Sequence, residues 1–394
     1  MPKRHEQVTI GELCEFANGN GFRPNDWKRE GLPIIRIQNL NGSQDFNYFD
    51  GTPNPKWVIE PGDLLFAWAG VKGVSFGPTI WPGPRGVLNQ HIFHIVPKPG
   101  IDRYWLYLAL QEATCRIEAN AHGFKSSLVH VHKEDITGQI VDLPPPGEQR
   151  KIAEILRTWE EGINRISALR AARQKRLAGL FQLLLGRSGA FPQRWPRKEL
   201  AAVSTRVRRV NGGGDHPVMT ISAKSGFLKQ SDKFARDMAG SSVERYILLR
   251  EGEFAYNKGN SLTAPYGCIF PLDQPTALVP FVYYCFALKT GLDQSFYTHL
   301  FAAGALNRQL SGLINSGVRN DGLLNLDAED FFNCEVPVPP LEEQRRIASA
   351  LTAAKHELAL LDQEIDALTR QKRGLMQKLL TGDWRVTNQL ENCQ

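Results

Sequence analysis

The sequence lacks long apolar runs, clustered cysteines and a strong excess of charge of either sign. No stretch of about 18 uncharged apolar residues occurs, and the N-terminus leads into no apolar segment, so we expect neither a membrane span nor a signal peptide. The six cysteines lie far apart along the chain, unlike those of disulfide scaffolds and zinc knuckles, which favours a reducing, cytoplasmic environment. The formal net charge of +6 permits a polyanionic partner but does not require one.

Catalytic signatures are also missing. The chain contains neither a GxxxxGK[ST] phosphate-binding loop nor a strand-associated GxGxxG motif. Residues 142–146 (DLPPP) are the nearest approach to the Pro-Pro-aromatic motif of amino-methylating enzymes, but they lack its aromatic residue and its spacing. His130 and His132 could present two imidazoles, but no third ligand is close in the sequence, which favours a structural or surface role. We therefore expect no catalytic site, no metal and no cofactor on this chain.

An internal repeat divides the 394 residues, which exceed the usual size of a single hydrophobic core. Residues 143–153 (LPPPGEQRKIA) return 195 positions later as residues 338–348 (VPPLEEQRRIA). The same offset relates 134–136 (EDI) to 329–331 (EDF) and 179–182 (GLFQ) to 374–377 (GLMQ). Each half of the chain is thus predicted to contain one globular domain and one helix.

Two long heptad helices follow from the pattern behind each repeated motif. Proline followed by Glu-Gln is typical of a helix start, and the apolar residues beyond it alternate at gaps of four and three. One seam contains Ile152, Leu156, Trp159, Ile163, Ile166, Leu177, Leu180 and Leu184, interrupted by Arg170 and Arg173. The other contains Ile347, Leu351, Ala354, Leu358, Leu361, Ile365, Leu368, Leu375 and Leu379, with Lys372 in its one polar position.

The helices are predicted to pack on each other. A helix over 148–185 would be about 57 Å long, more than one domain of this size could cover. A passive dimerisation helix is the simpler alternative, since long heptads often serve that purpose. The order of elements argues against it, because domain, helix, domain, helix places an antiparallel helix pair between two domains.

The predicted fold class is α/β (α+β), with two similar globular domains in tandem. Short β-like runs at 33–37, 62–67 and 91–96 alternate with loops rich in glycine, proline and aromatic residues, and helical stretches are expected at 104–118 and 296–313. The expected domains are 1–143 and 188–338. The first is followed by a long helix at 144–187, and the second by a helix and tail at 339–394. The helices are expected to form an antiparallel coiled coil with pseudo-twofold symmetry.

The repeat resembles the specificity subunits of Type I restriction-modification enzymes over essentially the whole chain. That family has two target-recognition domains, each followed by a helix that opens with a Pro-Pro-x-x-Glu-Gln-x-x-Ile-Ala-type motif. The motif stands here at 339–348 and, one residue shorter, at 145–153. Further matching stretches are 35–40, 88–91, 256–259 with 265–267, and 317–320.

The resemblance implies a non-catalytic reader of double-stranded DNA in a prokaryotic cytoplasm. Each target-recognition domain would read one half of a split target, and the helices would set the spacer. The partners would be two methyltransferase (modification) subunits, which carry S-adenosylmethionine, and restriction subunits, which use ATP and Mg. Two alternatives stay open: an enzyme with unrecognised catalytic motifs, and a two-headed protein-binding adaptor or scaffold without DNA specificity.

Candidate DNA-contacting residues lie in the predicted turns, where Arg, Lys, Asn and Gln could pair with base edges. They are Arg36, Gln38, Asn39, Asn89, Gln90 and Lys125 in the first domain and Lys258, Asn260, Arg319 and Asn320 in the second. Turn capping or contact with phosphate alone is the competing role. A basic run at Arg206, Arg208 and Arg209 is typical of a solvated face, but beside 211–214 (NGGG) it could also contact phosphate.

Candidate partner-binding residues lie at the two helix starts, where the resemblance implies docking of the methyltransferases. They are Glu148, Gln149, Arg150, Glu343, Gln344 and Arg345. The competing role for the two glutamines is to satisfy free N–H groups in the first helical turn.

Overall fold

The computed structural model describes residues 5–120, 128–186, 195–230, 244–259, 264–314 and 323–386. Four of the candidate residues, Lys125, Asn260, Arg319 and Asn320, lie outside these ranges. The chain forms two compact units: unit 1 comprises residues 1–166 and 364–394, and unit 2 comprises 167–363. Two helices of 40 residues each, α5 (Pro146–Leu185) and α11 (Leu341–Leu380), contribute to both units.

The globular part of unit 1 alternates short strands and short helices. In chain order it contains β1 (Glu6–Thr9), α1 (Ile10–Leu13), β2 (Cys14–Asn18), η1 (Pro24–Asp26), β3 (Leu32–Ile35), α2 (Ile37–Leu40), β4 (Asn47–Phe49), η2 (Pro55–Trp57), β5 (Val58–Ile59), β6 (Leu64–Ala67), β7 (Ala69–Val71), β8 (Gly77–Ile80), β9 (Gly86–Leu88), β10 (Ile92–Pro97), α3 (Arg103–Asn120), β11 (Leu128–His130), α4 (Lys133–Thr137) and β12 (Ile140–Leu143). The mixed α/β composition predicted from the sequence is confirmed.

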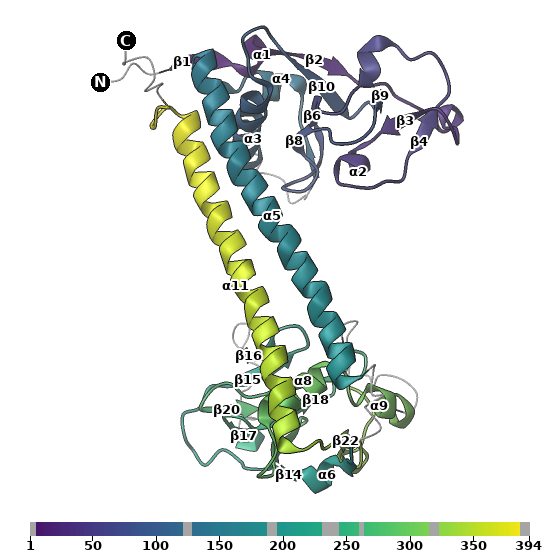
Figure 1. The fold of residues 1–394 in the computed structure, drawn as a ribbon, viewed down its shortest axis with the longest axis vertical. Coiled ribbons are helices and arrows are strands. Elements are labelled where there is room, and N and C mark those ends of the chain that lie inside the picture. Colours follow the sequence, from purple (N-terminus) through teal and green to yellow (C-terminus); the bar gives the residue numbers. More distant parts are fainter. Residues whose placement is uncertain are drawn as a thin grey trace. The chain divides into compact units, whose positions relative to one another are not determined.

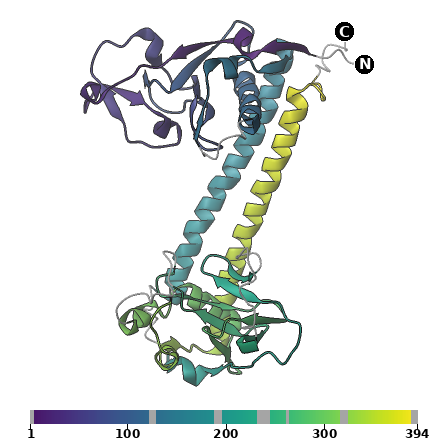
Figure 2. The same cartoon turned by 180° about the vertical axis from the view of Figure 1, so that it is seen from behind.

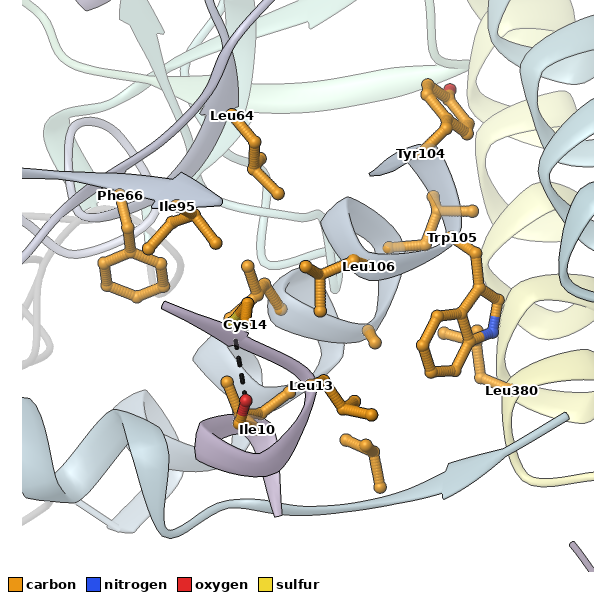
Figure 3. Packing of buried hydrophobic residues seen from close by; sticks show 14 of the residues in the cluster. Ile10, Leu13, Cys14, Leu64, Phe66, Ile95, Tyr104, Trp105, Leu106 and Leu380 are labelled. Carbon is orange, nitrogen blue, oxygen red and sulfur yellow. Dashed lines mark hydrogen bonds between the residues drawn. The ribbon is translucent and has the colours of Figure 1, made fainter. Parts of the chain in front are cut away.

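Two four-stranded sheets form the body of unit 1. The first has the order β2-β10-β6-β8 and is antiparallel, and the second has the order β4-β3-β9-β5 and contains the parallel pair β3-β9. One face of the first sheet packs on α3, where Phe66 and Ile95 lie in one cluster with Trp105 (Figure 3). The other face packs through Leu65 on Leu88 of the second sheet. Apolar side chains on both faces explain why β6 is buried throughout.

The globular part of unit 2 has a similar order of elements. It contains β13 (Arg197–Glu199), α6 (Leu200–Val203), β14 (Ser204–Arg206), β15 (Met219–Ser222), β16 (Gly226–Lys229), β17 (Ile247–Arg250), β18 (Phe254–Asn257), β19 (Cys268–Pro271), β20 (Thr276–Val279), β21 (Tyr284–Leu288), α8 (Gln294–Ala302), α9 (Asn307–Leu313), α10 (Ala328–Phe332) and β22 (Glu335–Pro337). Its four-stranded sheet, β14-β21-β18-β19, has the same connectivity as β2-β10-β6-β8.

The repeat extends to details that the two sequences barely share. The turn before β6 uses Gly62 with φ of 90°, and the turn before β18 uses Gly252 with φ of 83°, a region that favours glycine. The acid after each glycine, Asp63 or Glu253, accepts a hydrogen bond from a backbone N–H three residues earlier, at 2.8 Å in both cases. The two units are therefore versions of one fold.

The helices α5 and α11 run antiparallel within each unit (Figures 1 and 2). In unit 1, Glu160 of α5 pairs with Lys372 of α11. In unit 2, Arg170 pairs with Asp362 at 2.8 Å and Arg173 pairs with Glu357 at 2.9 Å. The residue number on α11 falls as the residue number on α5 rises, as in an antiparallel pair. The arginines that interrupt the first seam are thus bridged to carboxylates across the pair.

The heptad seams are the buried faces of both helices. Every seam position predicted from the sequence is buried or half-buried. The ends of the seams join the domain cores: Leu156 and Leu379 lie in the core of unit 1, and Leu351 and Leu180 in that of unit 2. The antiparallel packing predicted from the heptads is confirmed within each unit. Among the described residues no helix is long and apolar enough to cross a membrane.

Candidate nucleic-acid interface

Two polar turns of unit 1 meet because β3 and β9 pair in parallel. Ile35 lies opposite Leu88, and the N–H of Asn89 donates to the carbonyl oxygen of Ile35 at 3.0 Å. Parallel strands end at the same edge of a sheet, so Arg36 and Asn89, which follow these strands, lie side by side. Gln90 comes next and is exposed.

An aromatic cluster continues this row. The N–H of Trp68 donates to the carbonyl oxygen of His91 at 3.2 Å, and the two rings lie 5.0 Å apart. The ring of His130, in β11, lies 4.8 Å from that of Trp68. We call the six residues Arg36, Asn89, Gln90, His91, Trp68 and His130 the unit 1 strip.

The unit 1 strip has the chemistry of a surface that recognises bases. Amide and guanidinium groups can pair with base edges, and the indole and imidazole rings can stack on bases. Among the described residues, Trp68 Nε1 and His91 Nδ1 are buried and have no hydrogen-bond partner. The described residues contain no group of three His, Cys, Asp or Glu side chains that could hold a metal.

The same place in unit 2 carries a different side chain. In unit 1, Val131 N–H donates to Trp68 O at 3.2 Å, and in unit 2, Leu324 N–H donates to Lys258 O at 2.8 Å. Lys258 therefore occupies the position of Trp68. Its ammonium nitrogen lies 5.2 Å from the ring centre of Tyr284, a buried residue of β21. The backbone of the site is shared and its side chains are not.

Both long helices are anchored at their starts by a buried glutamine. Gln149 Oε1 accepts from the N–H of Asp102 at 2.8 Å, while its Nε2 donates to Pro144 O at 2.9 Å. Gln344 makes the same two bonds, with Asp293 N–H at 2.9 Å and Pro339 O at 2.7 Å. Each glutamine thus ties a long helix to the start of the domain helix, α3 or α8.

The carboxylate of Glu148, the residue before Gln149, contacts residues from both terminal segments of unit 1. Glu148 accepts from Arg385 through two guanidinium nitrogens, at 2.9 and 2.8 Å, and from the N–H of Val386 at 3.1 Å. His5 Nε2 lies 3.2 Å from the same carboxylate. Burial alone would raise the pKa of Glu148, but the hydrogen bonds from Arg385, Val386 and His5 outweigh it and lower the pKa.

Comparison with known proteins decides the family. Residues 2–171 and 206–370 match the model described as Type I restriction modification DNA specificity domain. The chain belongs to that family. Its two matched segments cover most of both units, so the role of this specificity chain is recognition of a DNA target in a type I restriction-modification system.

Relatives of this specificity chain carry corresponding names. The MjaVIII specificity subunit of Methanocaldococcus jannaschii is 23% identical over 98% of this chain and 95% of its own length. The EcoBI specificity subunit of Escherichia coli is 28% identical over 39% of this chain and 31% of its own length.

Two solved structures share the fold. The S subunit of the type I system of M. genitalium covers 95% of this chain and 96% of its own, with a TM-score of 0.57 and 16% identity. A chain described under complex assembly and conformational transition of the type I system covers 98% and 99%, with a TM-score of 0.57 and 17% identity.

Within the specificity chain, the candidate DNA residues of the first turn have different outcomes. Arg36 lies in the strip, with its guanidinium 5.4 Å from the ring centre of Trp27. Gln38 is exposed and donates to Asp45 O at 3.3 Å. Asn39 does not fit the predicted role, because it is 4% exposed and its amide is fully engaged: Oδ1 accepts from Arg36 N–H, and Nδ2 donates to two turn carbonyls.

The partner-binding candidates of the specificity chain also divide by burial. Gln149 and Gln344 are each 1% exposed, so direct contact of their side chains with a docked partner does not fit the structure. Glu148 is buried as well, and Glu343 is half-buried. Arg150 and Arg345 are exposed and stay candidates for docking.

Sequence reasoning missed Trp68, His91 and His130 as members of one site, and it missed Arg385. His130 was expected to have a structural or surface role, because no third ligand is close to it in the sequence. A tryptophan directly behind the buried strand β6 is a usable signal, since it places a large ring where the strand leaves the sheet. The approach of Arg385 to Glu148 joins residues 237 positions apart, which no local pattern indicates.

Proposed function

We propose that this specificity chain is a non-catalytic subunit that reads a bipartite DNA target, one half-site with each unit. The observation that carries the proposal is a shared framework with different side chains at equivalent positions. Trp68 and His130 in unit 1 correspond to Lys258 and Leu323 in unit 2, as the equivalent pairings of Ala69 with His130 and Gly259 with Leu323 indicate. One fold that presents two different surfaces suits the recognition of two different short sequences.

The strip residues would discriminate bases by hydrogen bonding and stacking. Arg or Lys pairs well with guanine, and Asn or Gln with adenine, each good pair contributing about 1–3 kcal/mol of discrimination. In unit 1 we assign this role to Arg36, Asn89 and Gln90. In unit 2 we assign it to Lys258 and, outside the described residues, to Asn260, Arg319 and Asn320.

The helices α5 and α11 would hold the spacer between the half-sites. Within each unit, buried seam residues and ion pairs hold α5 against α11. A fixed helix pair would allow the chain to prefer targets whose half-sites are separated by a fixed number of unspecified base pairs.

The partners would be two methyltransferase subunits, one at each helix start. Gln149 and Gln344 make matching hydrogen bonds, so the two starts offer similar surfaces, with Arg150 and Arg345 exposed on them. The methyltransferases would supply S-adenosylmethionine, and restriction subunits would supply ATP and Mg-dependent cleavage. The chain itself would perform neither reaction.

Copurification with a tagged chain tests this proposal against a protein-binding adaptor. The expected result is a methyltransferase in twofold excess, retention of the complex on duplex DNA at moderate salt, and methyl transfer only when the methyltransferase is present. The double variant Arg150→Glu with Arg345→Glu should lose the methyltransferase. Arg165→Glu, which changes an exposed residue in the middle of α5, is the matched control and should keep it. An assembled complex without affinity for DNA would favour the adaptor.

A further inference from the structure

In each unit, an exposed cation lies near an aromatic ring. One of the two residues belongs to a strand, β2 or β14, and the other belongs to a short helix, α4 or α10. In unit 1, Lys133 of α4 places Nζ 5.7 Å from the ring centre of Phe16 of β2. In unit 2, Arg206 of β14 places Cζ 5.6 Å from the ring centre of Phe332 of α10. We call these two places the cation corners.

The strand residues of the two corners are equivalent in the fold, whereas Lys133 begins α4 and Phe332 ends α10. Phe16 pairs with Ile95 in the sheet and Arg206 pairs with Phe286, and these are matching positions of β10 and β21. Unit 1 thus has the ring on the strand and the cation on the helix, whereas unit 2 has the reverse. Both units therefore bring a cation and a ring together between these two elements, with the contributions of strand and helix exchanged.

Neither cation has a carboxylate partner among the residues that the structure describes. Among the described residues, no ion pair involves Lys133, Arg206 or Arg208, and Arg208 is exposed two residues beyond Arg206. Burial and the neighbouring charge of Arg208 lower the pKa of Arg206. Arg209 differs from both, because Glu253 pairs with it at 3.0 Å.

The corners lie next to the surfaces assigned to base reading. Arg206 also approaches the ring of Tyr284, at 5.8 Å, and Lys258 lies over the same ring. Lys133 follows His130 of the unit 1 strip by three residues and lines a groove of about 670 Å³ together with Lys56 and Trp57. Glu15 also lines this groove but forms no ion pair with either lysine.

We propose that the two cation corners bind phosphodiester groups of the DNA backbone beside each half-site. This inference rests on the proposed function and adds its electrostatic contacts. Ring contacts hold each cation in place, so little side-chain freedom is lost when a phosphate arrives. The corners would fix the position of the DNA without reading its sequence.

The test is the salt dependence of binding to a mixed-sequence duplex, measured by fluorescence anisotropy with the full chain. Each phosphate contact adds about 0.9 to the slope of log affinity against log salt. Lys133→Gln and Arg206→Gln should each lower the slope by about 0.9, and the double variant by about 1.8. Between about 50 and 200 mM salt each single variant should lose roughly threefold less affinity than the wild type.

Charge-preserving variants and ion-paired cations are the controls. Lys133→Arg and Arg206→Lys should keep the wild-type slope. Arg165→Gln and Arg197→Gln, whose side chains pair with Glu161 and Glu335, should also keep it. A wild-type slope in Arg206→Gln and Lys133→Gln, with or without a loss of thermal stability, would make the corners packing contacts and overturn the inference. A wild-type chain that does not bind duplex DNA would refute the proposed function itself, and the inference with it.

Discussion

At the scale of single residues, the two glutamines of the repeated motif show how a residue that looks like a docking residue can serve the fold. Gln149 and Gln344 look like surface docking residues in the sequence, yet each side chain is buried and satisfies one backbone N–H and one backbone carbonyl. A buried polar group without its partner costs more than the bond itself contributes. These glutamines therefore act on the fold first, and on partner binding only through the position of the helix start.

Replacing either glutamine should destabilise the fold. Gln149→Ala leaves the Asp102 N–H and the Pro144 carbonyl without partners, which should lower the free energy of unfolding by about 1–3 kcal/mol. Urea titration followed by circular dichroism measures it. Arg150→Ala, at the next residue and exposed, should change stability by less than about 0.5 kcal/mol. Equal effects of the two substitutions would contradict the buried role.

The hydrogen bonds around Glu148 should make the free energy of unfolding depend on pH in the acidic range. The folded pKa of Glu148 lies below its ordinary value of 4.5, so its stabilisation is fully present above that pH and is lost as the pH falls through the folded pKa. Glu148→Gln should cost about 2 kcal/mol at neutral pH, and the difference from the wild type should shrink below the ordinary pKa. Thermal unfolding from pH 7 to pH 3 measures both. A pH-independent difference would show that charge is not involved.

At the scale of elements, the sequence predicted the helices far better than the strands and turns. A heptad can be read within one segment, and every predicted seam position is buried or half-buried. The predicted strand at 33–37 instead ends at Ile35, because Arg36 is the N-cap of α2. The backbone N–H of Arg36 donates to the side-chain oxygen of Asn39 in the first turn of that helix. The predicted helix at 296–313 breaks around Gly304, which has φ of 73°.

The candidate site was harder to predict, because pairing between distant segments creates it. Arg36 and Asn89 were selected for their turns and do lie together, but only the parallel pairing of β3 with β9 places them side by side. Trp68 and His130 meet because β7 pairs with β11, across a separation that no local pattern reveals. Asn39 was selected for its residue type, and its burial decides against it.

The middle of the helix pair should control the preferred spacer length. Leu361 and Ile365 are half-buried seam residues, so truncation of each to alanine should cost about 2 kcal/mol, the low end for buried aliphatic residues. The double variant should bind half-sites at several separations where the wild type prefers one. Binding to duplexes of stepped spacer length measures this preference.

The neighbouring residue provides the control for the spacer experiment. Leu360 is 50% exposed and lies off the seam, so Leu360→Ala should keep both stability and spacer preference. A Leu361→Ala, Ile365→Ala chain with wild-type stability and one preferred spacer would contradict the assignment of the spacer to the helices.

At the scale of the whole molecule, two copies of one fold carry different surfaces. The copies agree in strand order, in glycine turns and in the buried glutamine, and they differ at the strip and in which element supplies the corner cation. Elements that maintain the fold are thus kept, and positions that would touch DNA vary. Such a division is what independent reading of two half-sites requires.

Selection of bound duplexes from a randomised pool, followed by sequencing, tests this central claim most directly. The wild type should select two specified blocks separated by an unspecified gap. Gln90→Ala should relax only the block read by unit 1, Lys258→Ala only the block read by unit 2, and Gln174→Ala, on an exposed position of α5, neither block. A single continuous block, or the same change in both blocks from Gln90→Ala or Lys258→Ala alone, would contradict the account.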